Sequence, residues 1–341
     1  MRTALTVALA FAAGVVVTLV ESTGPHFIAS SFQLEPPAAT TSAATAAPVS
    51  VADISTDAPL IDPWPESAPT PEQVIYAQPR MVQDALAKLS PRLAGTPNLY
   101  LLAFAGDGSE DVFRNEAEYA TQLFSRRFGP ATHTLLLQNN PATLQTDPLA
   151  SWSNLEAALH GLDAIMQPED ILVLYMTTHG SQDHTLLVDM APLPLDQIGA
   201  QDLANILSMH DFRWKVLVIN ACYSGGFVPP LRGPGTLVMT AARSDRSSFG
   251  CGSESEITYF GHAWLENALN RTDNLVDAFT QASREIASWE KQDKLPRSEP
   301  QIDIGSGIEQ QLSRWRDGQS PAPVVPFKPA APASPETVPA R

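Results

Sequence analysis

The segment Lys215–Gly226, KVLVINACYSGG, sets the topology expected for this chain. Its uninterrupted aliphatic run, Val216–Ile219, is typical of a strand buried on both faces of a parallel sheet. Such a strand delivers the residues that follow it to the carboxyl edge of the sheet, where open α/β folds bind their ligands. Cys222 falls at that edge, and the two glycines after it permit a tight turn.

A second strand of the same kind, residues 171–176, leads into Thr177-Thr178-His179-Gly180. A cysteine at a strand end is more often a small buried apolar residue than a nucleophile. A thiolate and an imidazole at one sheet edge, however, are the pair that acyl transfer requires, and they need only be close in space. The sequence therefore favours Cys222 and His179 as a nucleophile and its proton-transfer partner.

The remainder of the chain alternates between strand and helix patterns. The predicted strands are 99–105, 133–138, 171–176, 216–219, 236–241 and 301–304, with a short one at 185–189, and the predicted helices are 71–89, 111–128, 152–166, 196–210, 259–270 and 275–291. Ser151 stands at the cap position of the third helix. This alternation predicts an α/β fold with a mostly parallel six-stranded sheet covered by helices on both faces.

Five segments between residues 98 and 304 resemble a known family. They are FAGDGSEDVFRNEAEYA, THG, NACYSGG, TAARSDRSSFGCG and TYFGHAW. In order and spacing they are similar to the legumain family of cysteine peptidases, which includes asparaginyl endopeptidases and the transamidase that attaches lipid anchors. The bacterial, membrane-associated branch is the most similar. The resemblance implies a three-layer, caspase-like architecture.

The same resemblance implies a cysteine endopeptidase that needs no cofactor. Cys222 would attack the scissile carbonyl of a peptide or protein substrate, His179 would protonate the departing amine, and the N–H groups of Gly180 and Cys222 would face the oxyanion. An amine in place of water would make the enzyme a transamidase or transpeptidase. A scaffold or binding protein that keeps the fold without turnover is the remaining alternative.

The substrate pocket departs from the family pattern. Arg114 and Ser248 match the pocket arginine and serine of the family, but Asn220 and His262 stand where legumains carry glutamate and aspartate. Loss of both carboxylates predicts a more positive pocket, which is compatible with an acidic side chain at the cleavage point. A solvated helix position is the alternative for Arg114, and a helix-face position for His262.

The second cysteine leaves two interpretations open. Cys251 follows a strand end, as Cys222 does, so the two thiols can meet at one edge and form a disulfide in an oxidising compartment. The resemblance favours a free thiol, because the matching position is not part of the catalytic dyad of the family. Asp170, Asp183 and Asp189 lie near the dyad in sequence, but the sequence identifies no third catalytic residue. No ligand spacing indicates a metal site.

The two ends of the chain differ from the middle. Residues 1–22 form a membrane anchor or signal peptide, since the apolar run 3–20 would span roughly 27 Å as a helix at about 1.5 Å per residue. Residues 23–71 read as a Pro/Ala/Thr-rich linker, 72–310 as the caspase-like domain, and 311–341 as a disordered Pro/Ala-rich tail.

Charge and the leading segment also indicate partners and location. The formal net charge of −16 over 341 residues argues against nucleic acid or an anionic membrane surface as a partner. Arg2 before the apolar run predicts that the amino end stays in the cytoplasm and that the following domain is exported across the membrane. We expect a protein of the bacterial inner membrane with its catalytic domain on the periplasmic side, or a secreted or periplasmic protein if the leader is cleaved.

Overall fold

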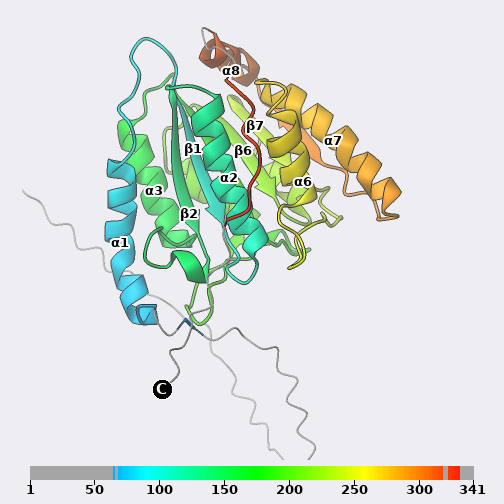
Figure 1. Ribbon diagram of the computed structural model, residues 1–341. Coiled ribbons are helices and arrows are strands. Elements are labelled where there is room, and N and C mark those ends of the chain that lie inside the picture. The colour runs from blue at the N-terminus through cyan, green and yellow to red at the C-terminus, as the bar shows by residue number, and fades with distance from the viewer. Residues whose placement is uncertain (1–63, 66–67, 318–321, 331–341) are drawn as a thin grey trace, which may run out of the picture. The chain divides into compact units, whose positions relative to one another are not determined.

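Six strands form one sheet in the computed structural model, which describes residues 64–65, 68–317 and 322–330. All of these belong to one of two units of the chain, Pro59–Arg341. The order across the sheet is β2-β1-β3-β6-β7-β8, in which β8 alone runs antiparallel to its neighbour (Figure 1). The strands are β1 (Leu99–Ala105), β2 (Thr132–Gln138), β3 (Ile171–Thr177), β6 (Trp214–Asn220), β7 (Thr236–Thr240) and β8 (Gln301–Ile304).

The central strands are buried on both faces, which explains their continuous apolar runs. Alternate side chains of each strand point to opposite faces, because the side-chain period of a strand is two. In β3, Val173 and Tyr175 join one apolar cluster, whereas Leu172, Leu174 and Met176 join the other. The prediction of a mostly parallel, helix-covered sheet is therefore confirmed.

Helices cover the two faces in separate groups. One face packs against α1 (Pro71–Ala87), α3 (Trp152–Ile165), α4 (Ala200–Ser208) and α5 (Val228–Leu231). The other packs against α2 (Asp111–Arg127), α6 (Tyr259–Gly261), the π-helix η3 (His262–Ala268), α7 (Leu275–Gln292) and α8 (Ile308–Arg316), as Figure 1 shows. Short 3₁₀ turns, η1 (Pro141–Thr143) and η2 (Ser224–Phe227), follow β2 and β6.

The predicted element ends agree with the structure except at a few places. The hydroxyl of Ser151 accepts a hydrogen bond from Asn154 N (3.3 Å), so this cap prediction is confirmed. The helix predicted from residue 196 begins at Ala200, because residues 198–199 pair as β5 (Ile198–Gly199) with β4 (Thr185–Leu186).

The expectation of a disordered tail from residue 311 is wrong for two segments. Helix α8 continues to Arg316 and buries Trp315 against Phe128, with ring centroids 5.5 Å apart. Residues 322–330, which we call the strap, run beside α2 (Figure 1), where Val325 joins the apolar core. A Pro-rich composition predicted poor burial, but the docked strap contributes Val325 and Phe327 to the packing.

The predicted anchor, residues 1–22, lies outside the described residues, as does most of the predicted linker. Among the helices of the described residues, none has both the length and the apolar character needed to cross a bilayer.

Candidate active site

Strand pairing brings the ends of β3 and β6 together. Thr177 and Asn220 are register partners, so His179 and Cys222 each lie two residues beyond the same row of the sheet. Thr178 N donates to Asn220 O (3.2 Å), which extends this pairing past the strand ends. A Cβ atom on Gly180 would lie 2.2 Å from the carbonyl oxygen of Cys222. Glycine is therefore required after the histidine because the two backbones touch.

The sulfur of Cys222 is half-buried among hydrogen-bond donors. Ser248 N donates to Cys222 Sγ (3.3 Å), and the hydroxyl of Ser248 lies 3.6 Å from it. The thiol of Cys251 also hydrogen-bonds this sulfur and is the largest cause that lowers the pKa of Cys222, ahead of the opposing effect of burial. These donors favour the thiolate, the form that acts as a nucleophile.

Cys251 is the protonated partner of this pair. Hydrogen bonding to Cys222 raises the pKa of Cys251, burial raises it further, and the negative charge of Glu110 adds to both. Cys251 also packs against the apolar cluster that contains Phe113. Both cysteines are free thiols in the structure.

The chain turns sharply after Cys222. Tyr223 adopts a left-handed conformation (φ 55°), which is uncommon for a residue other than glycine. Its N–H donates to Arg246 O (2.7 Å), and this bond holds the turn against the loop that carries Ser248. Strained backbone of this kind is concentrated at functional sites.

His179 is in contact with two residues from the β1–α2 connection and α2. Its side chain is 37% exposed, and Nε2 lies 3.6 Å from Asp107 Oδ2. The ring of Phe113 meets the imidazole edge-on, with centroids 5.0 Å apart. Phe113 also belongs to the cluster against which Cys251 packs, so His179 and Cys251 both lie next to this part of the fold.

Two backbone donors at this edge are unoccupied. The N–H groups of Gly180 and Cys222 donate no hydrogen bond within the part of the chain that the structure describes. Such free N–H groups beside a nucleophile are suited to stabilise an oxyanion. They are the two groups that the sequence predicted for this role.

The surroundings of Arg114 differ from expectation. Arg114 Nε donates to Glu118 Oε1 (3.1 Å), and Nη1 lies 3.3 Å from Asn140 Oδ1 and 3.8 Å from Asp111 Oδ1. The guanidinium is thus already neutralised by carboxylates of its own helix. This pairing weakens the argument for a more positive pocket, and an acidic side chain at the cleavage point stays a prediction.

Two other predicted pocket residues make structural contacts. Asn220 is buried and donates to Glu116 Oε1 (2.5 Å), beneath the sheet edge rather than on its surface. His262 pairs with Glu266 (3.5 Å) and lies against the ring of Trp289 on α7. Their polar groups are used in these contacts, and their placement in the substrate pocket stays a prediction. Ser248 contacts the sulfur of Cys222 itself.

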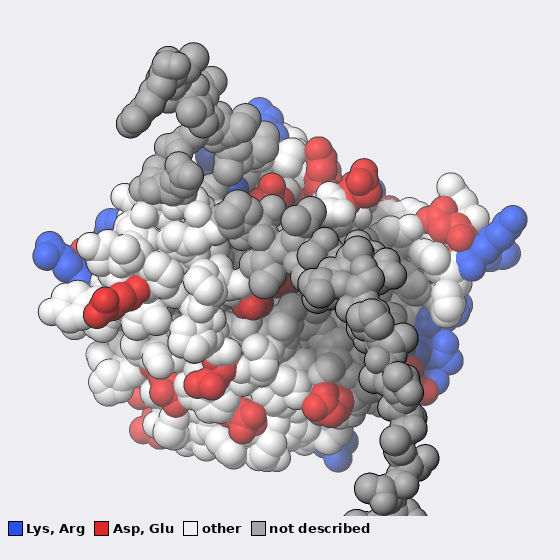
Figure 2. All heavy atoms as spheres, turned by 90° about the horizontal axis from the view of Figure 1, so that it is seen from below, with Lys and Arg blue, Asp and Glu red and all other residues white. Residues whose placement is uncertain are grey.

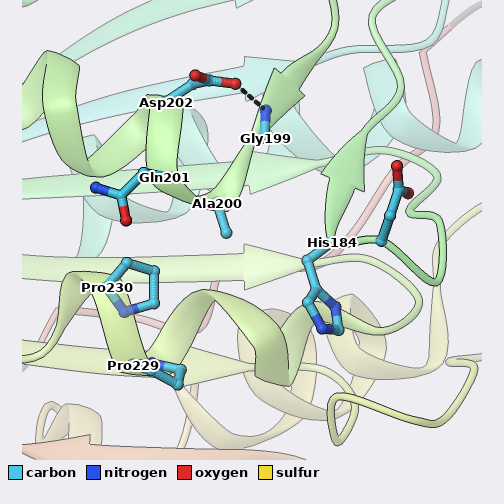
Figure 3. Close-up of a pocket in the computed structure, with 8 residues that line it drawn as sticks. His184, Gly199, Ala200, Gln201, Asp202, Pro229 and Pro230 are labelled. Atoms are coloured by element: carbon cyan, nitrogen blue, oxygen red, sulfur yellow. Dashed lines mark hydrogen bonds between the residues drawn. The ribbon is translucent and has the colours of Figure 1, made fainter.

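A separate cavity lies near the turn after Cys222, since His184 contacts that turn and lines the cavity. It has a volume of about 570 Å³ and is lined by residues of the β4–β5 region, the start of α4 and α5, including His184, Asp202 and Pro229 (Figure 3). The ring of His184 lies against Gly226, and its Nδ1 is 3.2 Å from Tyr223 O. His184 therefore supports the turn rather than lining the space beside His179.

The face seen from below in Figure 2 carries scattered Asp and Glu side chains, with Lys and Arg toward its margins.

Near His179 lies a further carboxyl group, Glu110, whose Oε2 is buried and has no hydrogen-bond partner among the described residues. Burial and the charge of Asp107 raise the pKa of Glu110. No group of three or more His, Cys, Asp or Glu side chains able to hold a metal ion occurs in the described parts of the chain.

Comparison with known proteins gives a family and a structural likeness. Residues 157–310 match the model of the Peptidase C13 family. The crystal structure of Caspase-1 from Spodoptera frugiperda is similar with a TM-score of 0.43 and 10% sequence identity, over 63% of this chain and 88% of that one. No curated protein matches this chain.

The family match supports a cysteine peptidase, a hydrolase that would act on peptide or protein substrates. The match of residues 157–310 to this family, the family of legumain, supports a legumain-like peptidase. The resemblance inferred from the sequence motifs is thereby confirmed. The matched segment contains His179 and Cys222, whereas Arg114 and Asp107 precede it.

Proposed function

We propose that this protein is a cysteine endopeptidase in which Cys222 is the nucleophile and His179 the proton-transfer partner. The observation that carries the proposal is the shared register of β3 and β6, since it supports a thiol and an imidazole at equal distances beyond one row of the sheet. The donors around the sulfur and the unoccupied N–H groups of Gly180 and Cys222 support the same role.

In the proposed reaction, the thiolate of Cys222 adds to the scissile carbonyl carbon, and the oxyanion accepts hydrogen bonds from the N–H groups of Gly180 and Cys222. The imidazolium of His179 then gives its proton to the departing amine, leaving a thioester. Water attacks the thioester, His179 takes a proton from that water, and the acid product leaves with Cys222 again a thiolate. If an amine attacks instead, the product is a new amide.

The test is a peptide-library digest with the full-length protein, analysed by mass spectrometry. Peptide cleavage by the wild type that is lost in Cys222→Ala supports the proposal. We expect His179→Ala to lower the rate of cleavage at least about 100-fold. Cleavage that survives in Cys222→Ala would refute the assignment of the nucleophile. Added hydroxylamine or a glycine amide separates transamidation from hydrolysis by the mass of the acyl product.

We also propose that the catalytic domain acts on the outer side of the bacterial inner membrane, either tethered or released. The support is the apolar run at residues 3–20 and Arg2 before it. Fractionation of cells that express the full chain, with added protease on spheroplasts, tests this location. A domain that stays protected from protease in intact spheroplasts would contradict it.

A further inference from the structure

A third residue shares the register of the proposed catalytic pair. Ala105 of β1, Thr177 of β3 and Asn220 of β6 lie in one row across three adjacent strands. Asp107, His179 and Cys222 are each two residues beyond that row, so their backbones leave the same edge in the order of the strands. Asp107 is 2% exposed, and its Oδ2 lies 3.6 Å from His179 Nε2.

The backbone groups of the residues on either side of Asp107 form hydrogen bonds to two other segments, the end of β3 and the segment that contains Asp189. Gly106 N donates to Thr177 O (3.1 Å), and Gly106 O accepts from Asp189 N (2.9 Å). Gly108 N in turn donates to Asp189 O (2.9 Å). These bonds fix Asp107 relative to the end of β3, the strand that carries His179.

The carboxylate itself is oriented by Ser109. Both the backbone N–H and the hydroxyl of Ser109 donate to Asp107 Oδ1, at 2.8 and 2.7 Å. Because Oδ1 is occupied, Oδ2 is the oxygen directed at the imidazole. A carboxylate on one ring nitrogen fixes the tautomer and the orientation of a histidine, as it does in Ser-His-Asp triads.

We propose that Asp107 is a positioning residue that holds Nε2 of His179 and so directs Nδ1 toward the sulfur of Cys222. The inference rests on the proposed function. With Nε2 turned to Asp107, Nδ1 is the nitrogen left to give a proton to the departing amine. The ring of Phe113, edge-on to the imidazole, also limits its rotation.

Glu110 is the other carboxyl group near this imidazole, and it is a poorer candidate. Its charge acts on His179, but it makes no hydrogen bond to the ring, and its Oε2 lacks any partner in the described residues. Asp107 alone combines contact with the imidazole and a fixed orientation. Comparison of variants at the two positions therefore separates a local contact from a general effect of negative charge.

The experiment compares two substrates with one acyl sequence, chosen as the peptide cleaved best in the library digest: its amide and its p-nitrophenyl ester. The nitrophenolate leaving group needs no proton, whereas the amine leaving group of the amide must be protonated as it departs. A misplaced imidazole therefore slows acylation by the amide more than acylation by the ester. We expect Asp107→Asn to lower kcat for the amide by about 10- to 100-fold with little change in KM. With the ester, the rate of the initial nitrophenolate burst, which reports acylation before His179 has to activate water, should change by less than about threefold.

Two further variants protect the test from a folding artefact. Ser109→Ala removes one donor to Asp107 and should show a milder form of the same amide-selective loss. Asp84→Asn, at an exposed carboxylate of α1 that pairs with Arg80 (3.5 Å), should leave both rates unchanged. Thermal unfolding of each variant reports its fold.

Some outcomes overturn the inference. Equal loss for amide and ester in Asp107→Asn, no loss at all, or amide-selective loss in Glu110→Gln but not in Asp107→Asn would each refute a positioning role for Asp107. In those cases wild-type cleavage, abolished in Cys222→Ala, leaves the proposed function standing. A wild type that cleaves neither substrate would refute the proposed function and, with it, the role of Asp107.

Discussion

Asn220 and Glu116 form a buried pair beneath the proposed active site, with 2.5 Å between Asn220 Nδ2 and Glu116 Oε1. Glu116 is completely buried and accepts three more hydrogen bonds, from the hydroxyls of Tyr175 and Thr258 (2.6 Å each) and from Thr258 N (3.1 Å). A carboxyl group in this place explains why residue 220 is an amide. A second acid there would put two acceptors face to face.

The first prediction follows from this pair. Asn220→Asp replaces a donor by an acceptor without a change in shape, and it should lower the free energy of unfolding by about 3 kcal/mol. Urea denaturation measures the loss. Glu116→Gln in the same chain restores a donor and should recover at least half of it, as a double-mutant cycle would show. Additive losses in the double variant would contradict a direct interaction.

The second prediction concerns the thiolate. Cys251 is the main cause of the lowered pKa of Cys222, so Cys251→Ala should raise that pKa by about one unit, the equivalent of one hydrogen bond to a charged group. Below the raised pKa a smaller fraction of the sulfur is ionised. Alkylation by iodoacetamide, followed from pH 4 to 9, should therefore have its midpoint at higher pH in the variant.

Ser248→Ala is the matched control for this measurement. Its hydroxyl is 3.6 Å from the sulfur, while the backbone N–H at 3.3 Å remains in the variant. The midpoint should move less than in Cys251→Ala. An unchanged midpoint in Cys251→Ala would mean that the second thiol does not stabilise the thiolate.

The third prediction is a loss of stability in acid. His133 is buried between Asn98 and Ser90, each 2.9 Å from a ring nitrogen, and burial lowers its pKa. The unfolded chain takes up a proton near pH 6.5 whereas the folded chain does so only at lower pH. Stability contributed by the neutral ring is thus complete above about pH 6.5 and is lost as pH falls toward the folded pKa.

His133→Gln removes this titration, so the change in unfolding free energy between pH 7 and pH 5 should be smaller than in the wild type. Each unit of pKa difference corresponds to about 1.4 kcal/mol. His262→Gln, at a side chain that is 45% exposed, is the control and should keep the wild-type change. Identical pH dependence in all three proteins would rule out His133 as the source.

Much of the fold could be predicted because its strands are simple in composition. The run Leu99–Ala105 is apolar throughout and buried throughout, and its predicted bounds agree with the structure. The pair Cys222 and His179 could be predicted as well, since each follows a buried strand. Asp107 has the same offset from β1, but only the pairing of Ala105 with Thr177 reveals that the three offsets share a row.

The substrate pocket was harder to predict because its polar groups have partners within the fold. Arg114 is neutralised by Glu118 on its own helix, and Asn220 by Glu116, which precedes it by 104 residues. Matching single positions to a family pattern takes no account of such partners. The docking of the strap could not be predicted either, because the residues that form hydrogen bonds to it, Tyr119 and Asn270, lie far from it in sequence.

The last prediction concerns that strap. Tyr119 donates through its hydroxyl to Val325 O (2.7 Å), and the side-chain amide of Asn270 bonds both Val325 O (3.0 Å) and Val325 N (2.8 Å). The Val325 side chain is 6% exposed, whereas that of its neighbour Val324 is 64% exposed. Two adjacent valines therefore offer a matched comparison.

Val325→Asp loses apolar burial and places a carboxylate in the core, so the free energy of unfolding should fall by about 3 kcal/mol, while Val324→Asp should change it by less than about 0.5 kcal/mol. Urea denaturation of the two full-length variants measures the difference. Because the strap ends with Ala330 N donating to Asn115 on α2 (2.9 Å), beside Arg114, its release should also lower peptidase activity. Equal stability of the two variants would show that the strap does not contribute to the folded core.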